Sequence, residues 1–256
     1  MMIRSIHISL ILAVVALPVL MPSPVQAFWI WNPKTKELKN PKYTAQKAPK
    51  NQLDHGLKLF EDENYKGALD EFEKLVNTYP EVREAAEAQY YIGRCLEQLG
   101  KYYEAFESYQ IVIDKYPFSE RSTEIIPRQF ELAEQLIETQ KEQNLFMDTV
   151  AGTTEKVVEI YETVIENVPY GDLAAKSQYR MAEYLLEQEW YREAREAFEK
   201  TIEVYPDSEW ARNARLQIAV ADAERSAKAG YDQTVTEKAV QGFKNYLELY
   251  PEEEKR

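Results

Sequence analysis

The residue types that most often carry out catalysis are scarce in this sequence. It contains two histidines, of which only His55 lies beyond the first 27 residues, and one cysteine, Cys95. No serine–histidine–aspartate set, paired-cysteine metal spacing or glycine-rich phosphate loop can be read from it. Carboxylates are abundant, but those on helix faces are usually solvated, so a hydrolase that uses them is the weaker hypothesis. We therefore expect no enzyme, no metal site and no cofactor.

The first 27 residues have the layout of a secretory signal peptide. Arg4 precedes an apolar stretch from Ile8 to Leu17, and prolines interrupt this stretch before it reaches the roughly 20 residues that span a bilayer. The small residues around Gln26 and Ala27 suit signal peptidase. We expect cleavage after Ala27 and export from the cytoplasm; an uncleaved anchor is the alternative.

Charge and composition favour a helical protein that binds other proteins. The net charge is -13, and basic residues are interspersed with acidic ones instead of clustered, which argues against nucleic acid as a partner. Only eight glycines occur, and alternating β-branched residues are almost absent. With a single cysteine, no disulfide can form within the chain.

One spacing recurs along the chain. An alanine is followed four residues on by an aromatic residue and twelve residues on by a proline, in copies that begin at Ala68, Ala105, Ala194 and Ala239. A weaker copy keeps Tyr161 and Pro169 but has Val157 in place of the alanine. Twelve residues before three of these alanines lies another small residue: Gly56, Gly93 and Ala182. The repeat is therefore a pair of helices, in which small residues allow close approach and the proline ends the second helix.

This pattern resembles the tetratricopeptide repeat, which consists of two antiparallel helices with small residues and a closing proline. We predict an all-α fold, a superhelical solenoid of about five such pairs over residues 48–256. First helices are then expected to line the concave side and second helices the convex side. Longer connections near residues 144–155 and 226–235 are expected to emerge as loops at one edge.

The concave side is the predicted partner-binding surface. On each first helix, the positions three before, one after and four after the small residue share one face. An aromatic residue beside charged residues along a groove suits an extended or helical peptide. For Tyr90 and Tyr179 the alternative is packing between helices. The predicted binding residues are Tyr90, Arg94, Glu97, Phe130, Glu134, Tyr179 and Glu183.

Two long phrases resemble a particular family. "FEKLVNTYPEVREAAEAQYYIGRCLEQLGKYYEAFESYQIVIDKYPFS" and "VIENVPYGDLAAKSQYRMAEYLLEQEWYREAREAFEKTIEVYPDS" look like the BamD/YfiO family of periplasmic five-repeat proteins. The resemblance implies a scaffold, located in the periplasm at the inner face of the outer membrane, that helps to assemble β-barrel proteins. Its implied partners are other barrel-assembly proteins and unfolded barrel precursors. The alternative is a Tol-Pal-type, CpoB-like coordinator of the cell envelope.

The stretch between signal and repeats departs from that family. The lipid-bearing cysteine expected after the signal is missing, and Phe28 takes its place. Residues 28–47 are rich in proline and lysine and are predicted to form an extended arm. Its aromatic start can contact a membrane interface or dock on protein, and we favour protein because four residues anchor weakly in lipid. The residues of this docking arm are Phe28, Trp29, Ile30 and Trp31.

Overall fold

The structure is a computed structural model that describes residues 30–32, 37–39, 48–144, 152–228 and 233–251. The chain divides into two units, residues 1–44 and 45–256. The first contains β1 (Ile30–Asn32) and β2 (Glu37–Lys39), which pair antiparallel with Ile30 opposite Lys39 and Trp31 opposite Leu38. Phe28 and Trp29 of the predicted arm lie outside the described residues.

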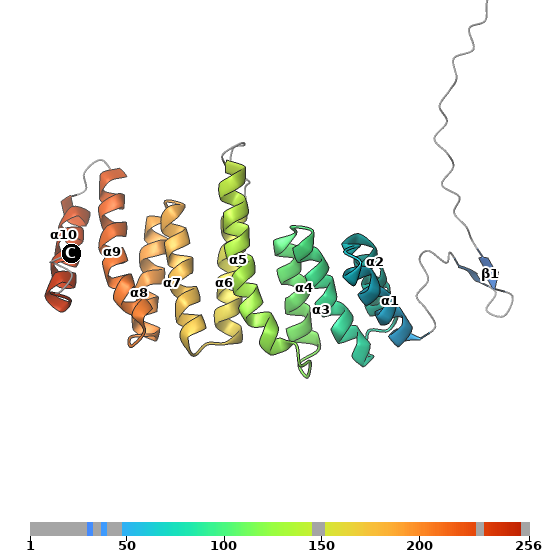
Figure 1. Cartoon of the computed structure of the whole chain (residues 1–256). Helices are drawn as coiled ribbons and strands as arrows, with labels where there is room; N and C mark the ends of the chain where they lie inside the picture. Colours follow the sequence, from blue (N-terminus) through green and yellow to red (C-terminus); the bar gives the residue numbers. More distant parts are fainter. Residues whose placement is uncertain (1–29, 33–36, 40–47, 145–151, 229–232, 252–256) are drawn as a thin grey trace, which may run out of the picture. The chain divides into compact units, whose positions relative to one another are not determined.

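Helices joined by turns make up the described part of the second unit, and they follow one another as five pairs (Figure 1). The pairs are α1 (Pro49–Glu61) with α2 (Tyr65–Thr78), α3 (Arg83–Gln98) with α4 (Tyr102–Lys115), α5 (Ser122–Asn144) with α6 (Thr153–Asn167), α7 (Asp172–Glu187) with α8 (Tyr191–Val204), and α9 (Glu209–Lys228) with α10 (Gln233–Leu249). In the first four pairs the second helix packs on the first helix of the next pair, as well as on its own partner. The predicted all-α solenoid of five pairs is confirmed.

Small residues and aromatic rings meet inside the first two pairs. A Cβ added at Gly93 would lie 2.5 Å from Cε1 of Tyr109, and one added at Gly56 would lie 2.5 Å from Cε1 of Phe72. These rings are fully buried, so the two helices of a pair touch through the glycine backbone. Cys95 is also buried, which raises the pKa of its thiol to about 12 and leaves a small apolar group.

A row of glutamines ties first helices to second helices. Gln52, Gln89 and Gln178 lie four residues before the small residue of their helices and are buried. Their Nε2 atoms donate to backbone carbonyls of the second helix, at Glu71 (3.2 Å), Ser108 (3.2 Å) and Ala197 (3.3 Å). Each acceptor directly precedes the buried aromatic of that helix, so the bond holds the ring in register.

Two of the tyrosines that precede a closing proline link neighbouring pairs. The hydroxyl of Tyr116 donates to the carbonyl of Pro80 at 3.1 Å, and that of Tyr205 donates to the carbonyl of Pro169 at 3.3 Å. The tyrosine therefore reaches back to the end of the preceding pair. This role is structural, because it satisfies a carbonyl that the ended helix leaves free.

The third pair is longer than the others. Helix α5 has 23 residues and extends past its neighbours (Figure 1). Near its end, Gln140 accepts from the hydroxyl of Tyr184 at 2.6 Å, and Lys141 lies 3.3 Å from Glu187, both on α7. The lengthened connection predicted here is thus partly helix; residues 145–151 lie outside the described part. Helix α9 is extended similarly, to 20 residues.

Candidate partner-binding surface

The predicted binding residues lie on the face formed by the first helices, which we call the first-helix face. Helix α1 contacts α3 there, and α7 contacts α9. The other neighbouring first helices are joined by charged side chains, which connect α3 to α5 and α5 to α7. We call this row the arginine–glutamate ladder; it consists of Glu87, Glu97, Arg121, Arg128, Glu134 and Arg180.

Tyr90 lies beneath the part of the ladder formed by Arg121 and Glu87. It is 1% exposed, and its hydroxyl donates to Glu124 and accepts from Arg94 at 3.2 Å. The guanidinium of Arg121 lies 4.6 Å from the centre of the Tyr90 ring. Burial and then the bond to Glu124 raise the pKa of Tyr90. The Tyr90 ring is thus enclosed between helices, which is the alternative that the sequence analysis gave for this residue.

Glu97 lies between two arginines. Nε of Arg94 is 3.4 Å and Nη1 of Arg128 is 3.0 Å from its carboxylate. Burial nevertheless raises the pKa of Glu97 above its ordinary value, because the carboxylate is only 11% exposed and loses its hydration. Arg94 and Glu97 are therefore occupied with partners inside the array.

A pocket of about 480 Å³ opens beside Glu97 and Arg128, where α3, α4 and α5 meet. Side chains of both charges and amide groups surround it, and only Leu132 is a buried aliphatic lining residue. Such a lining offers donors and acceptors at once, which suits the polar backbone of a peptide. The full lining is Glu97, Gln98, Tyr102, Arg128, Glu131, Leu132 and Gln135.

The part of the ladder that joins α5 to α7 surrounds Glu134. Arg180 donates to both of its oxygens, from Nε at 2.9 Å and from Nη2 at 2.7 Å, and also to Glu183 from Nη1 at 2.7 Å. The hydroxyl of Tyr161 donates to the same carboxylate at 2.6 Å. Burial alone would raise the pKa of Glu134, but these hydrogen bonds outweigh it and hold the pKa below its ordinary value.

The two remaining predicted residues are aromatic and buried. Phe130 is 7% exposed; its ring lies 5.7 Å from the Tyr161 ring and 4.6 Å from Nζ of Lys176. Tyr179 is 5% exposed and lies 5.3 Å from the ring of Trp210. Both rings pack between helices, so the structure brings the seven residues to one face but leaves chiefly charged atoms there. Peptide binding by these seven residues stays a prediction.

Sequence reasoning missed the arginines that complete the ladder. Arg128 lies five residues before the small residue of α5, and Arg180 lies two before that of α7, outside the positions assigned to the face. A long side chain reaches across to the next helix from such flanking positions. The available signal is an arginine three or four residues from a glutamate on a first helix, as in Arg94–Glu97 and Arg180–Glu183.

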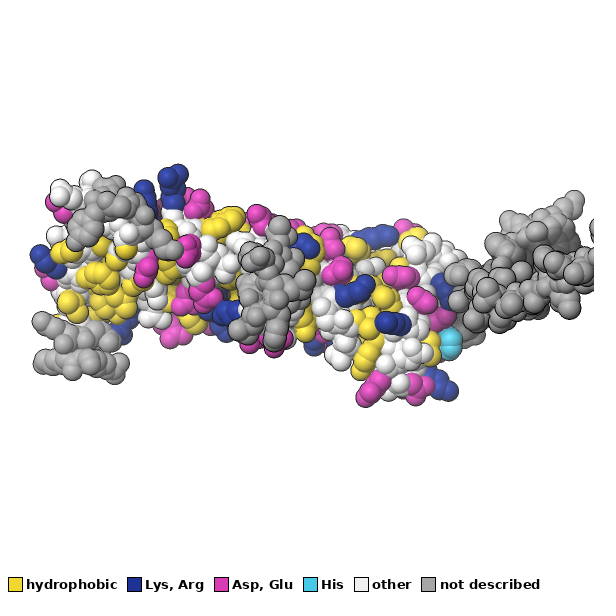
Figure 2. Space-filling model, turned by 90° about the horizontal axis from the view of Figure 1, so that it is seen from above, with side chains coloured by type: hydrophobic (Ala, Val, Ile, Leu, Met, Phe, Trp, Pro, Cys, Tyr) yellow, Lys and Arg dark blue, Asp and Glu magenta, His cyan; other side chains and the backbone are white. Residues whose placement is uncertain are grey.

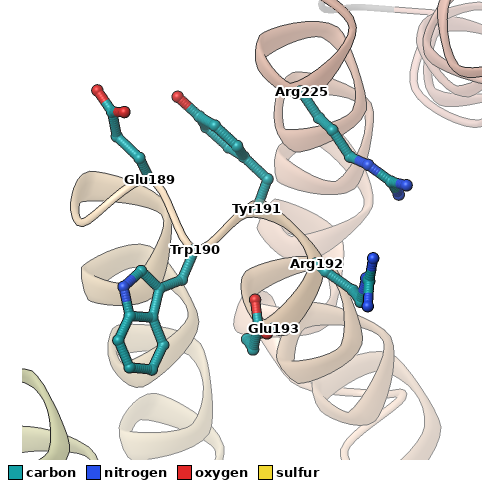
Figure 3. A pocket seen from close by; sticks show the side chains of 6 residues that line it. All are labelled: Glu189, Trp190, Tyr191, Arg192, Glu193 and Arg225. Carbon is teal, nitrogen blue, oxygen red and sulfur yellow. The ribbon is translucent and has the colours of Figure 1, made fainter. Parts of the chain in front are cut away.

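A second pocket, of about 500 Å³, lies where the turn between α7 and α8 faces α9 (Figure 3). Arg192 and Arg225 point to the same side of it, whereas Trp190 points the other way. Trp190 is 40% exposed. This pocket was not predicted, since its residues come from the turn and from a helix more than 30 positions away.

The described residues contain neither a candidate membrane-spanning helix nor a candidate metal-binding cluster. No helix among them is long and apolar enough to cross a bilayer. No group of three or more histidine, cysteine, aspartate or glutamate side chains in the described part of the chain is arranged to hold a metal ion.

Helix pairs with this register and packing define a tetratricopeptide-repeat protein. Residues 53–120 match the family model described as a tetratricopeptide repeat. Residues 171–256 match the model of YfiO, described as an outer membrane lipoprotein. The predicted resemblance to the BamD/YfiO family is therefore confirmed.

Solved structures resemble the chain more distantly. MamA has a TM-score of 0.42 at 18% identity, over 81% of this chain and 94% of that one. A Podosopora anserina kinesin light chain variant with TPR-like repeats has a TM-score of 0.40 at 15% identity, over 82% and 100%. A tetratricopeptide repeat protein from Parabacteroides merdae has 0.39 at 15%, over 76% and 72%. No curated protein matched the chain.

Proposed function

We propose that this BamD/YfiO-like scaffold takes part in the assembly of β-barrel proteins into the outer membrane. The match of residues 171–256 to the YfiO model carries the proposal. The repeat architecture supports it, because such arrays act by binding other proteins. We place the protein in the periplasm, at the inner face of the outer membrane, with barrel-assembly proteins and unfolded barrel precursors as partners.

The first-helix face is the proposed binding surface, centred on the pocket beside Glu97. The ladder fixes the charged side chains in place, so a peptide meets a surface that is already ordered. Gln98, Glu131 and Gln135 at the pocket are exposed and offer amide and carboxylate groups. Tyr102 supplies a ring with a polar tip at its edge.

Photo-crosslinking in intact cells tests the proposal. A photoreactive residue replaces Gln135 at the pocket, and a matched variant carries it at Glu166, an exposed position on the second helix α6. We expect position 135, and not 166, to trap an outer-membrane barrel with a soluble-domain partner, or unfolded barrel precursors. Recovery of peptidoglycan synthases or Tol components at position 135 contradicts barrel assembly and supports the Tol-Pal alternative.

A further inference from the structure

The last described helix, α10, exposes residues whose counterparts in the earlier units are covered. Three positions recur on each second helix: one, four and eight residues after the repeat alanine, or Val157 in α6. The ring at the fourth position packs on the first helix of its own pair, whereas Arg195, at the first position of α8, reaches Asp222 of α9 at 3.2 Å. In the first four units the residues at the first and eighth positions are all buried or half-buried; they are Leu69, Val76, Phe106, Ile113, Val158, Ile165, Arg195 and Ile202. In α10 the same positions hold Val240, Phe243 and Leu247, and Val240 is 48% and Leu247 39% exposed. We call these three residues the terminal stripe.

Packing explains the difference. In the earlier units the first helix of the next pair covers the second helix: α3 covers α2, α5 covers α4, α7 covers α6 and α9 covers α8. Helix α10 packs on α9, and no helix of the described part follows it. Hydrophobic side chains gather at the α9–α10 end of the array (Figure 2). The terminal stripe therefore corresponds to the surface that earlier second helices turn toward the next unit, and no helix of the described residues lies on it.

The covering helices share a recognisable chemistry. Each has a large aliphatic residue directly before its small residue, and these residues lie in the core or pack against it. The pairs are Ile92–Gly93, Leu132–Ala133, Met181–Ala182 and Ile218–Ala219. A helix that covers α10 in the same way needs the same adjacent pair on an apolar face.

A second copy of this chain does not supply such a helix at its other end. Helix α1 has His55 before Gly56, and His55 is exposed together with Asn51, Asp54 and Lys58. Ile92, at the position in α3 that matches His55, is 7% exposed. The outer face of α1 is thus polar, whereas the outer face of α10 is apolar, and head-to-tail stacking would bury charge.

The charges of α10 argue against a lipid surface as the occupant. Glu237, Lys238, Lys244 and Glu248 are all exposed on this helix. Two acidic and two basic groups cancel, so α10 has no positive excess to attract anionic headgroups. The exposed Val240 and Leu247 and the half-buried Phe243 form a stripe at a spacing of three and four residues, which is the spacing that helix partners use.

We propose that the terminal stripe of α10 binds an amphipathic helix of another protein, which adds to the array as the next first helix. That helix carries a large aliphatic residue directly followed by alanine or glycine on its apolar face. The site lies outside the pocket beside Glu97, and the inference holds whether or not the protein acts in barrel assembly.

A peptide that copies a covering helix tests the inference. The probe is a labelled peptide of residues 172–188, which contains the Met181–Ala182 pair, and its control is the same peptide with Met181→Glu. We expect the probe to bind the purified full-length protein and to slow amide exchange in α10. The variant Val240→Gln/Leu247→Gln is expected to weaken binding at least about tenfold, because two aliphatic contacts are lost.

The variant Lys238→Gln/Lys244→Gln is the matched control on the same helix and is expected to bind the probe normally. All four substituted positions are exposed, so circular dichroism should show unchanged folding. Equal binding of the probe by Val240→Gln/Leu247→Gln, or no binding by the parent protein, overturns the proposal. Self-association or vesicle binding that this variant abolishes also overturns it, since the occupant is then a second copy or lipid.

Discussion

Two glutamates of the arginine–glutamate ladder both contact arginine, but their pKa values shift in opposite directions. Glu97 has an arginine at 3.0 Å and another at 3.4 Å, yet its pKa is raised because burial dominates. Glu134 accepts two bonds from Arg180 and one from Tyr161, at 2.6 to 2.9 Å, and its pKa is lowered. The Glu97 side chain is 11% exposed and that of Glu134 32%, so the loss of hydration outweighs the longer bonds from Arg128, at 3.0 and 3.3 Å, whereas the shorter bonds prevail at Glu134.

The substitution Glu134→Gln should lower the free energy of unfolding by about 1–3 kcal/mol, because Arg180 then loses one of its two carboxylate partners and keeps only Glu183. The parent protein gains stability from Glu134 above the unfolded pKa, near 4.3, and loses it as the pH falls through the lowered folded pKa. The difference between parent and variant should therefore shrink on acidification. Urea unfolding between pH 3 and pH 7 measures it. Glu138→Gln, at an exposed site on α5, should behave like the parent.

The substitution Glu97→Gln should cost less, below about 1 kcal/mol at pH 7, since the amide still accepts from Arg128 and avoids burying a charge. The pH dependence has the opposite sign. With a raised folded pKa, Glu97 contributes most below its unfolded pKa, and this contribution is lost as the pH rises through the folded value. The cost of the substitution should therefore fall between pH 4 and pH 7. A cost that grows over this range would contradict the assigned direction.

At the scale of elements, close contact of paired helices depends on a missing side chain. The substitution Gly93→Ala places a methyl group 2.5 Å from the buried ring of Tyr109, which must then move. Overpacking of this kind costs about 1–3 kcal/mol, whereas alanine gains at most about 1 kcal/mol of helix propensity. We expect a net loss of about 1–2 kcal/mol in urea unfolding. Combining Gly93→Ala with Tyr109→Leu should cost less than the sum of the two, because the smaller side chain frees the space.

The glutamine row shows why some element contacts escape sequence reading. Gln52, Gln89 and Gln178 recur four residues before a small residue, so the pattern itself is visible in the sequence. Glutamine is usually exposed, and a polar residue next to a helix core is normally assigned to the surface. Only the packed pair shows that the amide meets a carbonyl of the second helix.

At the scale of the whole molecule, the arm that precedes the repeats remains a prediction. Deleting residues 28–31 should release the protein from the envelope fraction or lower its stability, since three aromatic residues would lose contact with membrane or protein. Cell fractionation and thermal unfolding measure the two effects. Deletion of residues 33–36, which lack aromatics, is the control. If neither fractionation nor unfolding changes for the 28–31 deletion, both roles of the arm are excluded.

The sequence by itself determined the repeat. Alanine, aromatic and proline at fixed spacing predicted five helix pairs, because these residues act locally through helix termination and close approach. It also brought seven candidate residues to one face. The tertiary structure decided which of their atoms are available, burying Tyr90 and Tyr179 and pairing Glu97 and Glu134 with Arg128 and Arg180. Such contacts join residues about 30 to 50 positions apart, so they depend on how neighbouring pairs stack, which a single helix pattern does not specify.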